Sequence, residues 1–213
     1  MHGRFIVFEG VEGSGKTTQL QQCSDWLKTS EFGNSIPVVV TREPGGTSLG
    51  LELRQLLLSG QSSSIQNRTE LLLYAADRAQ HVEEFLKPKL AQGAIILCDR
   101  YTDSTVAYQG YGRGLDLSLI EQLNQIATGG LKSDLTLWLD VDAEIGLKRA
   151  RQRGKADRME QADLEFHQRV QQGFNELAAS YPQRIVRIDA SKSQEEVSFA
   201  IQTILRQRLR EWC

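Results

Sequence analysis

Five short apolar runs recur along the chain, separated by longer stretches of mixed polarity. They cover residues 5–9, 36–41, 94–98, 135–141 and 184–189. In the first run the apolar residues follow one another instead of alternating with polar ones, which is typical of a strand buried on both faces of a sheet. The five runs therefore predict five strands of a largely buried sheet.

Helical patterns lie between these runs. Leu49, Leu53 and Leu56 recur at helical spacing, and further helices are predicted over residues 17–28, 71–85, 116–127 and 161–180, from Asp142 into a basic run, and after residue 193. Because strands alternate with helices, the sheet should be parallel and covered on both faces by right-handed crossovers. The expected fold class is α/β, with three α/β/α layers built around a five-stranded parallel sheet.

Polar residues and a proline mark the expected helix ends. Asn67 with Glu70 matches a capping box that opens the long helix, and Ser193 with Glu196 matches one that opens the last helix. Pro88 is expected to break or kink the long helix, because a proline in a helix lacks an N–H and clashes with the preceding turn.

A glycine-rich loop follows the first strand and precedes the first helix. Its residues fit the spacing G-x-x-x-x-G-K-[ST]: Gly10, Val11, Glu12, Gly13, Ser14, Gly15, Lys16 and Thr17. Such a P-loop wraps backbone N–H groups around phosphate oxygens, and the helix behind it adds positive partial charge. Lys16 is expected to reach the β- and γ-phosphates of a nucleoside triphosphate, and the Thr17 hydroxyl to hold Mg²⁺. A glycine-rich turn without a ligand is the alternative, which the strand–loop–helix context disfavours.

Charged residues follow the second strand and the third. Ligands of parallel sheets bind beyond the carboxyl ends of the strands, so Arg42 and Arg100 should face the P-loop. Two guanidinium groups suit bidentate capture of a phosphate, although a pair of surface arginines would give the same pattern. Asp99 stands where a carboxylate would contact the water shell of Mg²⁺; a helix N-cap is the alternative for this residue.

Tyr74 and Arg78 share one face of the long helix because they lie four residues apart. An aromatic ring stacked on a base, beside a guanidinium that donates to the base edge, would form a nucleobase pocket. Core packing with a salt bridge is the alternative for this pair.

A basic segment lies between the fourth and fifth strands. Residues 148–158 carry six basic residues and one acidic residue, with Gly154 among them as a hinge. A mobile lid that brings positive charge over a transferring phosphate would have this composition. A solvated helix end is the alternative.

Length and composition fit a single globular domain. The 213 residues are expected to form one domain, 1–213, with the lid at about 148–160. The net charge of −2 provides no field that favours nucleic acid or an anionic membrane. No apolar run approaches the roughly 20 residues of a membrane span, and the N-terminus lacks a signal-peptide pattern. Cys23, Cys98 and Cys213 form no zinc pattern, so free thiols in a reducing cytoplasm are expected.

A P-loop indicates a nucleoside triphosphate but does not name the acceptor of the phosphoryl group. The chain has no N/T-K-x-D segment and no D-x-x-G motif after the third strand, which argues against a guanine-specific switch protein. Three interpretations stay open on the residues alone: a kinase of nucleoside monophosphates, a kinase of another nucleotide or deoxynucleoside, and a switch that hydrolyses the triphosphate slowly.

Five linked segments resemble the bacterial type of the thymidylate kinase family. They read FEGVEGSGKTTQ, TREPGGT, LLLYAADRAQH, DRYTDSTVAYQGYGRG and RARQRGKADR, in the family's order and over nearly the whole chain. The resemblance implies a nucleoside monophosphate kinase-like P-loop fold with a mobile lid. It also implies the reaction ATP + dTMP → ADP + dTDP with Mg²⁺, as part of dTTP biosynthesis, in a cytoplasmic homodimer.

The resemblance also implies roles for individual residues. Glu12 would meet the sugar 3′-hydroxyl or a nearby metal, Arg42 and Arg100 would bind the acceptor phosphate, Tyr74 would stack on thymine, and Arg78 would bond its edge. The base and sugar pocket would be completed by Thr105, Tyr108 and Gln109.

Other implied roles concern ATP and catalysis. Arg149 would lie against adenine, which residues 189–193 would border, and Glu165 is a weaker candidate for the metal or acceptor side. The P-loop positions 11–14 contain no Arg or Lys, as in family members whose lid is basic. Catalytic positive charge is therefore expected from Lys16, Arg100 and the lid residue Arg153.

Overall fold

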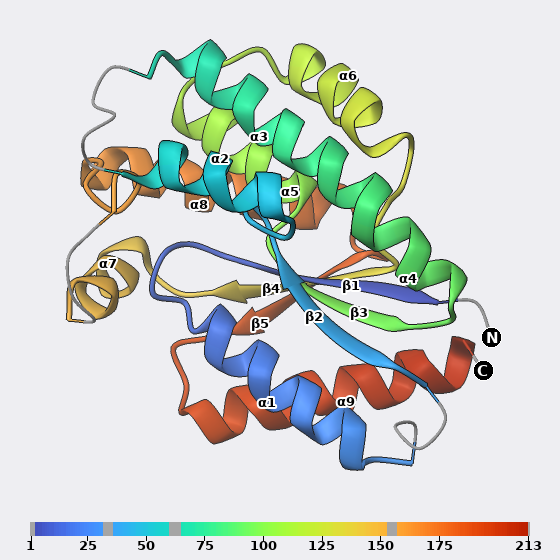
Figure 1. The fold of residues 1–213 in the computed structure, drawn as a ribbon. Helices are drawn as coiled ribbons and strands as arrows, with labels where there is room; N and C mark the ends of the chain where they lie inside the picture. The colour runs from blue at the N-terminus through green and yellow to red at the C-terminus, as the bar shows by residue number, and fades with distance from the viewer. Residues whose placement is uncertain (1–2, 32–35, 60–64, 153–156, 213) are drawn as a thin grey trace.

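Five strands form one parallel sheet in a computed structural model that describes residues 3–31, 36–59, 65–152 and 157–212 (Figure 1). The strand order is β2-β3-β1-β4-β5, so β1 lies at the centre. The strands are β1 (Arg4–Glu9), β2 (Val38–Arg42), β3 (Ile95–Asp99), β4 (Leu135–Asp140) and β5 (Ile185–Asp189). All five predicted strands and their parallel pairing are confirmed, with ends that differ by two residues at most.

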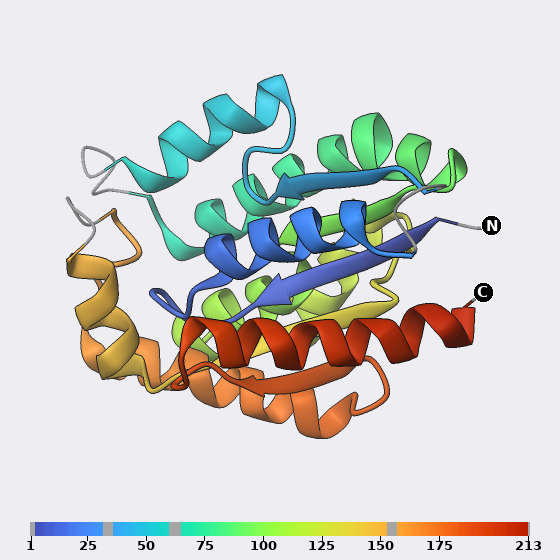
Figure 2. The ribbon, with the colours of Figure 1, turned by 90° about the horizontal axis from the view of Figure 1, so that it is seen from below.

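Helices cover both faces of the sheet. Figures 1 and 2 show α1 and α9 side by side on one face, while α3, α5, α6 and α8 lie on the other. The helices are α1 (Lys16–Thr29), α2 (Ser48–Leu58), α3 (Asn67–His81), α4 (Lys87–Ala91), α5 (Thr102–Thr105), α6 (Leu117–Thr128), α7 (Ala143–Arg151), α8 (Leu164–Ser180) and α9 (Gln194–Trp212). The three expected layers are therefore present.

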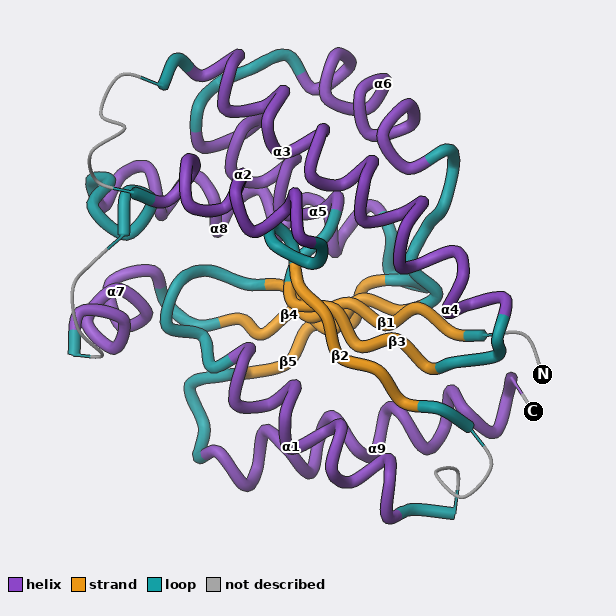
Figure 3. The backbone as a smooth tube through the Cα atoms, in the orientation of Figure 1, coloured by secondary structure: helices purple, strands orange, loops and turns teal. Residues whose placement is uncertain are grey.

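The central strand explains why the sheet is buried. Phe5, Ile6, Val7 and Phe8 of β1 are each fully inaccessible to solvent. Side chains of consecutive residues point to opposite faces of a strand, so an uninterrupted apolar run contacts both helical layers at once. β1 thereby delivers the P-loop at the middle of the carboxyl edge of the sheet (Figure 3).

The irregularity expected at Pro88 lies one turn earlier. Helical structure continues from α3 through a π-helical segment, Val82–Leu86, and then through Pro88 in the first turn of α4. The wider turn closes where the Lys87 N–H donates to the carbonyl of Val82, five residues back. Proline is tolerated in a first turn because its missing N–H is not needed there.

Of the two predicted capping boxes, one is confirmed and one is wrong. Ser193 Oγ accepts from the Glu196 N–H at 3.3 Å, and Glu196 Oε2 accepts from the Ser193 N–H at 3.0 Å. At the start of α3, however, Gln66 occupies the N-cap position and its side chain makes no capping bond. Glu70 is fully buried and forms an ion pair with Arg158 at 2.5 Å. Its carboxylate therefore pairs with a residue distant in sequence instead of capping the helix.

Helix α7, which leads into the basic segment, rests directly on the P-loop. A Cβ placed on Gly13 would come within 2.0 Å of the carbonyl oxygen of Gly146, and a Cβ on Gly146 within 2.3 Å of the carbonyl oxygen of Glu12. Only two glycines allow this approach. The base of the expected lid is therefore in backbone contact with the loop that should hold phosphate.

Within the ranges described, the structure contains no helix with the length and apolar character needed to cross a membrane.

Candidate active site

The P-loop has the backbone geometry that its glycines permit. Gly10, Gly13 and Gly15 have φ angles of +143°, +70° and +90°, values that residues with a Cβ rarely adopt. The Lys16 ammonium is directed back into the loop and donates to the carbonyls of Gly10 at 3.0 Å and Val11 at 2.9 Å. Burial and the neighbouring positive charge lower the pKa of Lys16 to about 8. The loop thus folds around the ammonium of Lys16.

Thr17 and Asp99 meet beside the loop, where Thr17 Oγ1 donates to Asp99 Oδ2 at 3.3 Å. The other carboxylate oxygen, Asp99 Oδ1, is buried and has no hydrogen-bond partner among the described residues. The N-cap alternative for Asp99 is wrong, because Tyr101 occupies the N-cap position of α5. An orphaned carboxylate oxygen beside a hydroxyl is the donor set that Mg²⁺ and its water shell require, so these residues fit the expected metal.

No described cluster of three or more His, Cys, Asp or Glu side chains could hold a metal by itself. Bound Mg²⁺ usually keeps several waters and takes its remaining ligands from one or two carboxylates and the substrate phosphates. Thr17 and Asp99 therefore suit an ion that arrives with a nucleotide.

Arg100 occupies a strained position at the end of β3. Its φ angle is +71°, in the left-handed region that favours glycine. Its guanidinium donates to Glu12 Oε1 at 2.5 Å, to the Gly10 carbonyl at 3.0 Å and to Ser104 Oγ at 3.1 Å. Tyr108 also donates to Glu12 Oε1, at 2.9 Å. Burial alone would raise the pKa of Glu12, but Arg100 and Lys16 outweigh it and hold this pKa at about 2.

Glu9, which the sequence interpretation did not single out, holds the strained turn of Arg100. Glu9 Oε1 accepts from the backbone N–H groups of Tyr101 at 2.8 Å and Ser104 at 3.1 Å, and Oε2 accepts from Ser104 Oγ at 2.6 Å. Burial raises the pKa of this carboxyl to about 7. The sequence did contain one signal for this role, because Glu9 is a charged residue at the end of the apolar run from Phe5 to Phe8.

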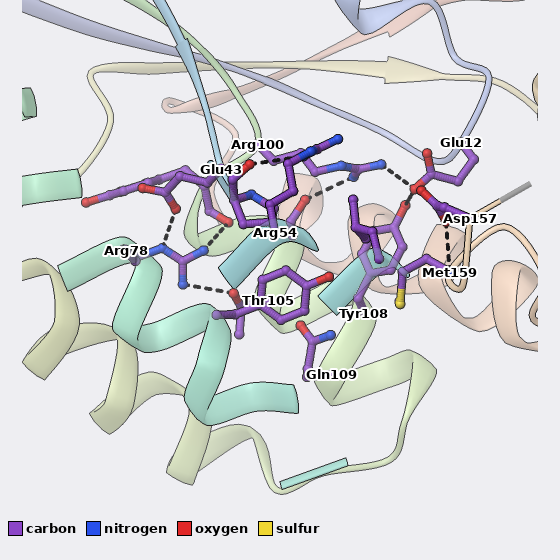
Figure 4. A pocket seen from close by; sticks show the side chains of 15 residues that line it. Glu12, Glu43, Arg54, Arg78, Arg100, Thr105, Tyr108, Gln109, Asp157 and Met159 are labelled. Atoms are coloured by element: carbon purple, nitrogen blue, oxygen red, sulfur yellow. Dashed lines mark hydrogen bonds and ion pairs between the residues drawn. The ribbon is translucent and has the colours of Figure 1, made fainter. Parts of the chain in front are cut away.

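A hollow adjoins this turn on the side of α3 (Figure 4). It brings together all the residues predicted for the base and sugar pocket, with several that were not predicted. It is lined by Glu12, Glu43, Pro44, Arg54, Leu58, Tyr74, Arg78, Arg100, Tyr101, Ser104, Thr105, Tyr108, Gln109, Asp157 and Met159. Burial raises the pKa of the half-buried Tyr74 hydroxyl, which therefore stays neutral in the pocket wall.

Arg78 combines the two interpretations that the sequence left open. It is buried and pairs with Glu43 at 2.8 Å, as a core residue with a salt bridge would. It also donates to Thr105 Oγ1 and Asn124 Oδ1, each at 2.9 Å, and to the Tyr101 carbonyl at 3.0 Å. These contacts use four of the five N–H groups of a guanidinium, so the described residues leave one N–H without an acceptor on a side chain that lines the pocket.

A second hollow continues from the first toward the P-loop and contains the residues predicted for phosphate. Lys16, Thr17, Arg42, Asp99 and Arg100 all line it. Arg100 lines both hollows, so one guanidinium borders the base pocket and the phosphate site. The two spaces form a single cleft along the carboxyl edge of the sheet.

A third hollow lies on the other side of the P-loop. It is lined by Ser14, Gly15, Thr18, Gln19, Arg149, Ala190, Lys192, Gln194 and Val197. Arg149 donates to the carbonyl of Ala190 at 3.0 Å. The structure thus brings Arg149 and the loop after β5 together, as expected for the adenine side.

Two expectations have a different outcome. Glu165 is exposed in the first turn of α8 and lines none of these hollows, whereas the acidic residues Asp157 and Glu160 line the second. Arg153 lies outside the described residues. Glu43, Arg54, Asp157 and Glu160 were missed because no local spacing marks a charged residue that reaches a cleft, whether from a loop or, as for Arg54, from helix α2.

Comparisons with known proteins bear directly on this cleft. A family model described as thymidylate kinase matches residues 8–201. The chain belongs to the thymidylate kinase family. It is 64% identical to a thymidylate kinase of Nostoc punctiforme over 212 residues, which cover 99% of each chain. It is 61% identical to that of Trichodesmium erythraeum over 100% of this chain and 99% of the relative.

A solved structure supports the same assignment. The thymidylate kinase of Ehrlichia chaffeensis superposes with a TM-score of 0.80 at 37% identity, over 96% of this chain and 100% of that one. The predicted family, the nucleoside monophosphate kinase-like P-loop fold and the predicted enzyme, a thymidylate kinase, are therefore confirmed. ATP is the phosphate donor of the thymidylate kinase family, as predicted.

Proposed function

We propose that this protein transfers the γ-phosphoryl group of ATP to the 5′-phosphate of dTMP, which forms ADP and dTDP for dTTP synthesis. The observation that carries the proposal is the continuous cleft, with Lys16 at one end, Arg78 and Tyr74 at the other, and Arg100 lining both parts. A slowly hydrolysing switch would need no pocket for an acceptor. The geometry therefore favours a kinase.

Phosphoryl transfer leaves little covalent work for side chains, so catalysis consists of positioning and charge stabilisation. Lys16 binds the β- and γ-phosphates of ATP, while Arg42 and Arg100 hold the phosphate of dTMP in line for attack. Thr17 and Asp99 would hold Mg²⁺, which would neutralise charge on the phosphate oxygens. The P-loop residues 10–17 supply N–H groups to the triphosphate.

The deoxynucleoside occupies the first hollow. Tyr74 stacks on thymine, and the remaining N–H of Arg78 donates to its carbonyl edge. Thr105 and Gln109 line the base, while Tyr108 and Glu12 border the sugar. This arrangement is supported by the position of each residue around the same space.

The lid, at about 148–160, completes the single domain that spans residues 1–213. Arg149 borders adenine, supported by its contact with the loop after β5. The closing of Arg153 over the transferring phosphate stays a prediction from the sequence. We place the enzyme in the cytoplasm.

Product formation from ATP with a panel of nucleoside monophosphates tests the proposal. ADP release that requires dTMP, with dTDP as the second product, is expected. ADP release of equal rate without an acceptor would instead indicate a switch, and a preference for another monophosphate would identify a different kinase.

Tyr74→Ala should weaken dTMP binding more than ATP binding. Base–aromatic stacking is worth roughly 1–3 kcal/mol in single-stranded nucleic-acid sites, which serves here as a scale. Calorimetric titration with each nucleotide measures both effects. Tyr74→Phe is the control, since it keeps the ring and should leave the dissociation constant of dTMP nearly unchanged. An unaltered constant in Tyr74→Ala would remove the ring from the pocket.

We also propose that the protein is a homodimer. Apolar side chains are exposed on the neighbouring helices α3 and α6, with exposed fractions of 52% for Leu72, 47% for Leu119 and 78% for Ile126. Burial of such a surface against a second copy is favourable because it removes apolar area from water.

Ile126→Glu should convert the dimer to a monomer, because the carboxylate would have to lose its hydration at the interface. Light scattering after size-exclusion chromatography gives the mass directly. Phe199→Glu is the matched control, since Phe199 is 70% exposed on α9 at the far side of the sheet. A dimer that persists in Ile126→Glu and dissociates in Phe199→Glu would place the interface on α9.

A further inference from the structure

A buried polar cluster lies behind the cleft, where α3 packs on the loop after β2. Glu43 and Arg78 face the first hollow, but His81 is fully buried and lines none of the hollows described above. Buried polar groups of this kind are costly unless they are hydrogen-bonded. The contacts of His81 therefore indicate what it stabilises.

Glu43 receives one α3 side chain on each carboxylate oxygen. Arg78 Nε donates to Glu43 Oε2 at 2.8 Å, and His81 Nδ1 lies 2.8 Å from Glu43 Oε1. Because a carboxylate oxygen only accepts, Nδ1 carries the proton in this contact. The other ring nitrogen, Nε2, lies 2.7 Å from Thr41 Oγ1.

The imidazole ring is fixed by packing as well as by hydrogen bonds. A Cβ placed on Gly46 would come within 2.4 Å of His81 Cδ2, and the Phe85 ring stacks on the imidazole with a centroid distance of 5.6 Å. The ring is thus confined between the loop after β2 and the helix. Packing holds the His81 ring in one orientation, so Glu43 cannot rotate away without losing the hydrogen bond from Nδ1.

The orientation of Arg78 depends on this carboxylate. Glu43 holds the guanidinium of Arg78 at Nε, while acceptors on Thr105, Asn124 and Tyr101 hold its two terminal nitrogens, so Glu43 is one of four contacts that set its plane. A rotated Glu43 would leave Nε without its acceptor, so the guanidinium could tilt about its remaining contacts and its last N–H would be less well positioned for the base.

We propose that His81 is a positioning residue that holds Glu43, and through it Arg78, in the orientation that reads the base of the acceptor nucleotide. The inference rests on the proposed function, because it assumes that Arg78 contacts the base. Its effect belongs to acceptor binding and base selection rather than to phosphoryl transfer. His81 itself does not touch the substrate.

Two substitutions separate the two contacts of the ring. In His81→Asn the amide nitrogen stands near the place of Nδ1 and keeps the bond to Glu43. In His81→Gln the amide stands near the place of Nε2, which keeps Thr41 and loses Glu43. Both remove the ring and the stacking on Phe85, so a purely structural role of His81 would affect both variants alike.

Steady-state kinetics with dTMP, and with dCMP as a base whose edge offers an amino group instead of a carbonyl, give the test. In His81→Gln the KM for dTMP should rise about tenfold, the scale of one lost hydrogen bond, and the preference for dTMP over dCMP should fall by a similar factor. The kcat and the KM for ATP should stay within about twofold in both variants, and His81→Asn should keep the wild-type KM for dTMP.

Equal changes in the two variants, or a loss confined to kcat or to the KM for ATP, would overturn the inference. If His81→Gln does not fold, Thr41→Val replaces it in the test: it leaves the Glu43 contact intact, so a large rise in the KM for dTMP would contradict the inference. The proposed function is tested separately, since a wild-type enzyme that does not phosphorylate dTMP refutes it before any variant is compared.

Discussion

Lys16→Ala should lower kcat by about 10³ or more while the fold stays intact. Donors aimed at developing charge are worth about 10²–10³ each in enzyme sites, and Lys16 is the P-loop's only cation. Among the described residues, its ammonium donates to two loop carbonyls and the Ser14 hydroxyl and to no core group, so its removal should open no core cavity. Single-turnover formation of dTDP and circular dichroism on the same preparation measure the two effects.

Lys28→Ala is the matched control, because Lys28 is an exposed lysine in the last turn of the same helix. It should keep wild-type turnover. Near-normal turnover in Lys16→Ala would show that ATP binds elsewhere, and joint loss of activity and helicity would show that Lys16 supports the fold instead.

The strands and the P-loop could be predicted because their determinants are contiguous in the sequence. Phe5 to Phe8 alone specify a strand buried on both faces, and the spacing from Gly10 to Thr17 specifies a phosphate loop in whatever protein surrounds it. The carboxyl-edge rule for parallel sheets then placed Arg42 and Arg100 correctly beside that loop.

Residues that act through distant partners could not be predicted in this way. Glu9 supports the turn of Arg100 through Ser104, a contact that joins positions 95 residues apart. Glu70 matched a local capping pattern, yet Arg158 and Gln109 take its carboxylate. A capping pattern fails as a predictor where folding brings a more strongly bonding partner to the same side chain. An ion pair or charge-assisted hydrogen bond stabilises the carboxylate more than an exposed cap does.

Arg78 shows that alternative interpretations of one residue need not exclude each other. The pairing with Glu43 supports the core interpretation, while the pocket that Arg78 lines supports the binding interpretation. In the sequence, the four-residue spacing of Tyr74 and Arg78 on one helix face fits both interpretations. Only the count of occupied N–H groups shows that the residue can do both.

Arg100→Ala should lower kcat/KM for dTMP by about 10³ or more, since arginines that stabilise transferring phosphate contribute about 10³–10⁵ in rate. Arg100 is one of five described residues that line both parts of the cleft, and its guanidinium also holds Glu12 at 2.5 Å. The loss should fall on dTMP-dependent steps, with a smaller change in ATP binding.

Arg100→Ala should also lower the free energy of unfolding in a way that depends on pH. Arg100 helps to hold the pKa of Glu12 at about 2, below its usual 4.5, so the ion pair stabilises the fold above pH 4.5 and this contribution is lost as the pH falls toward 2. The melting temperature of Arg100→Ala should therefore lie furthest below that of the wild type near neutral pH, and the difference should shrink in acid.

Arg100→Lys distinguishes charge from geometry in this prediction. Lysine keeps a positive charge beside Glu12 and should recover most of the stability, but it cannot make the bidentate contacts of a planar guanidinium. If the two parallel N–H groups of the Arg100 guanidinium hold the acceptor phosphate, Arg100→Lys should stay impaired by at least about tenfold in kcat/KM for dTMP. If Arg100→Lys is as active as the wild type, Arg100 acts only as the counter-ion of Glu12, and Arg42 must hold the acceptor phosphate without it.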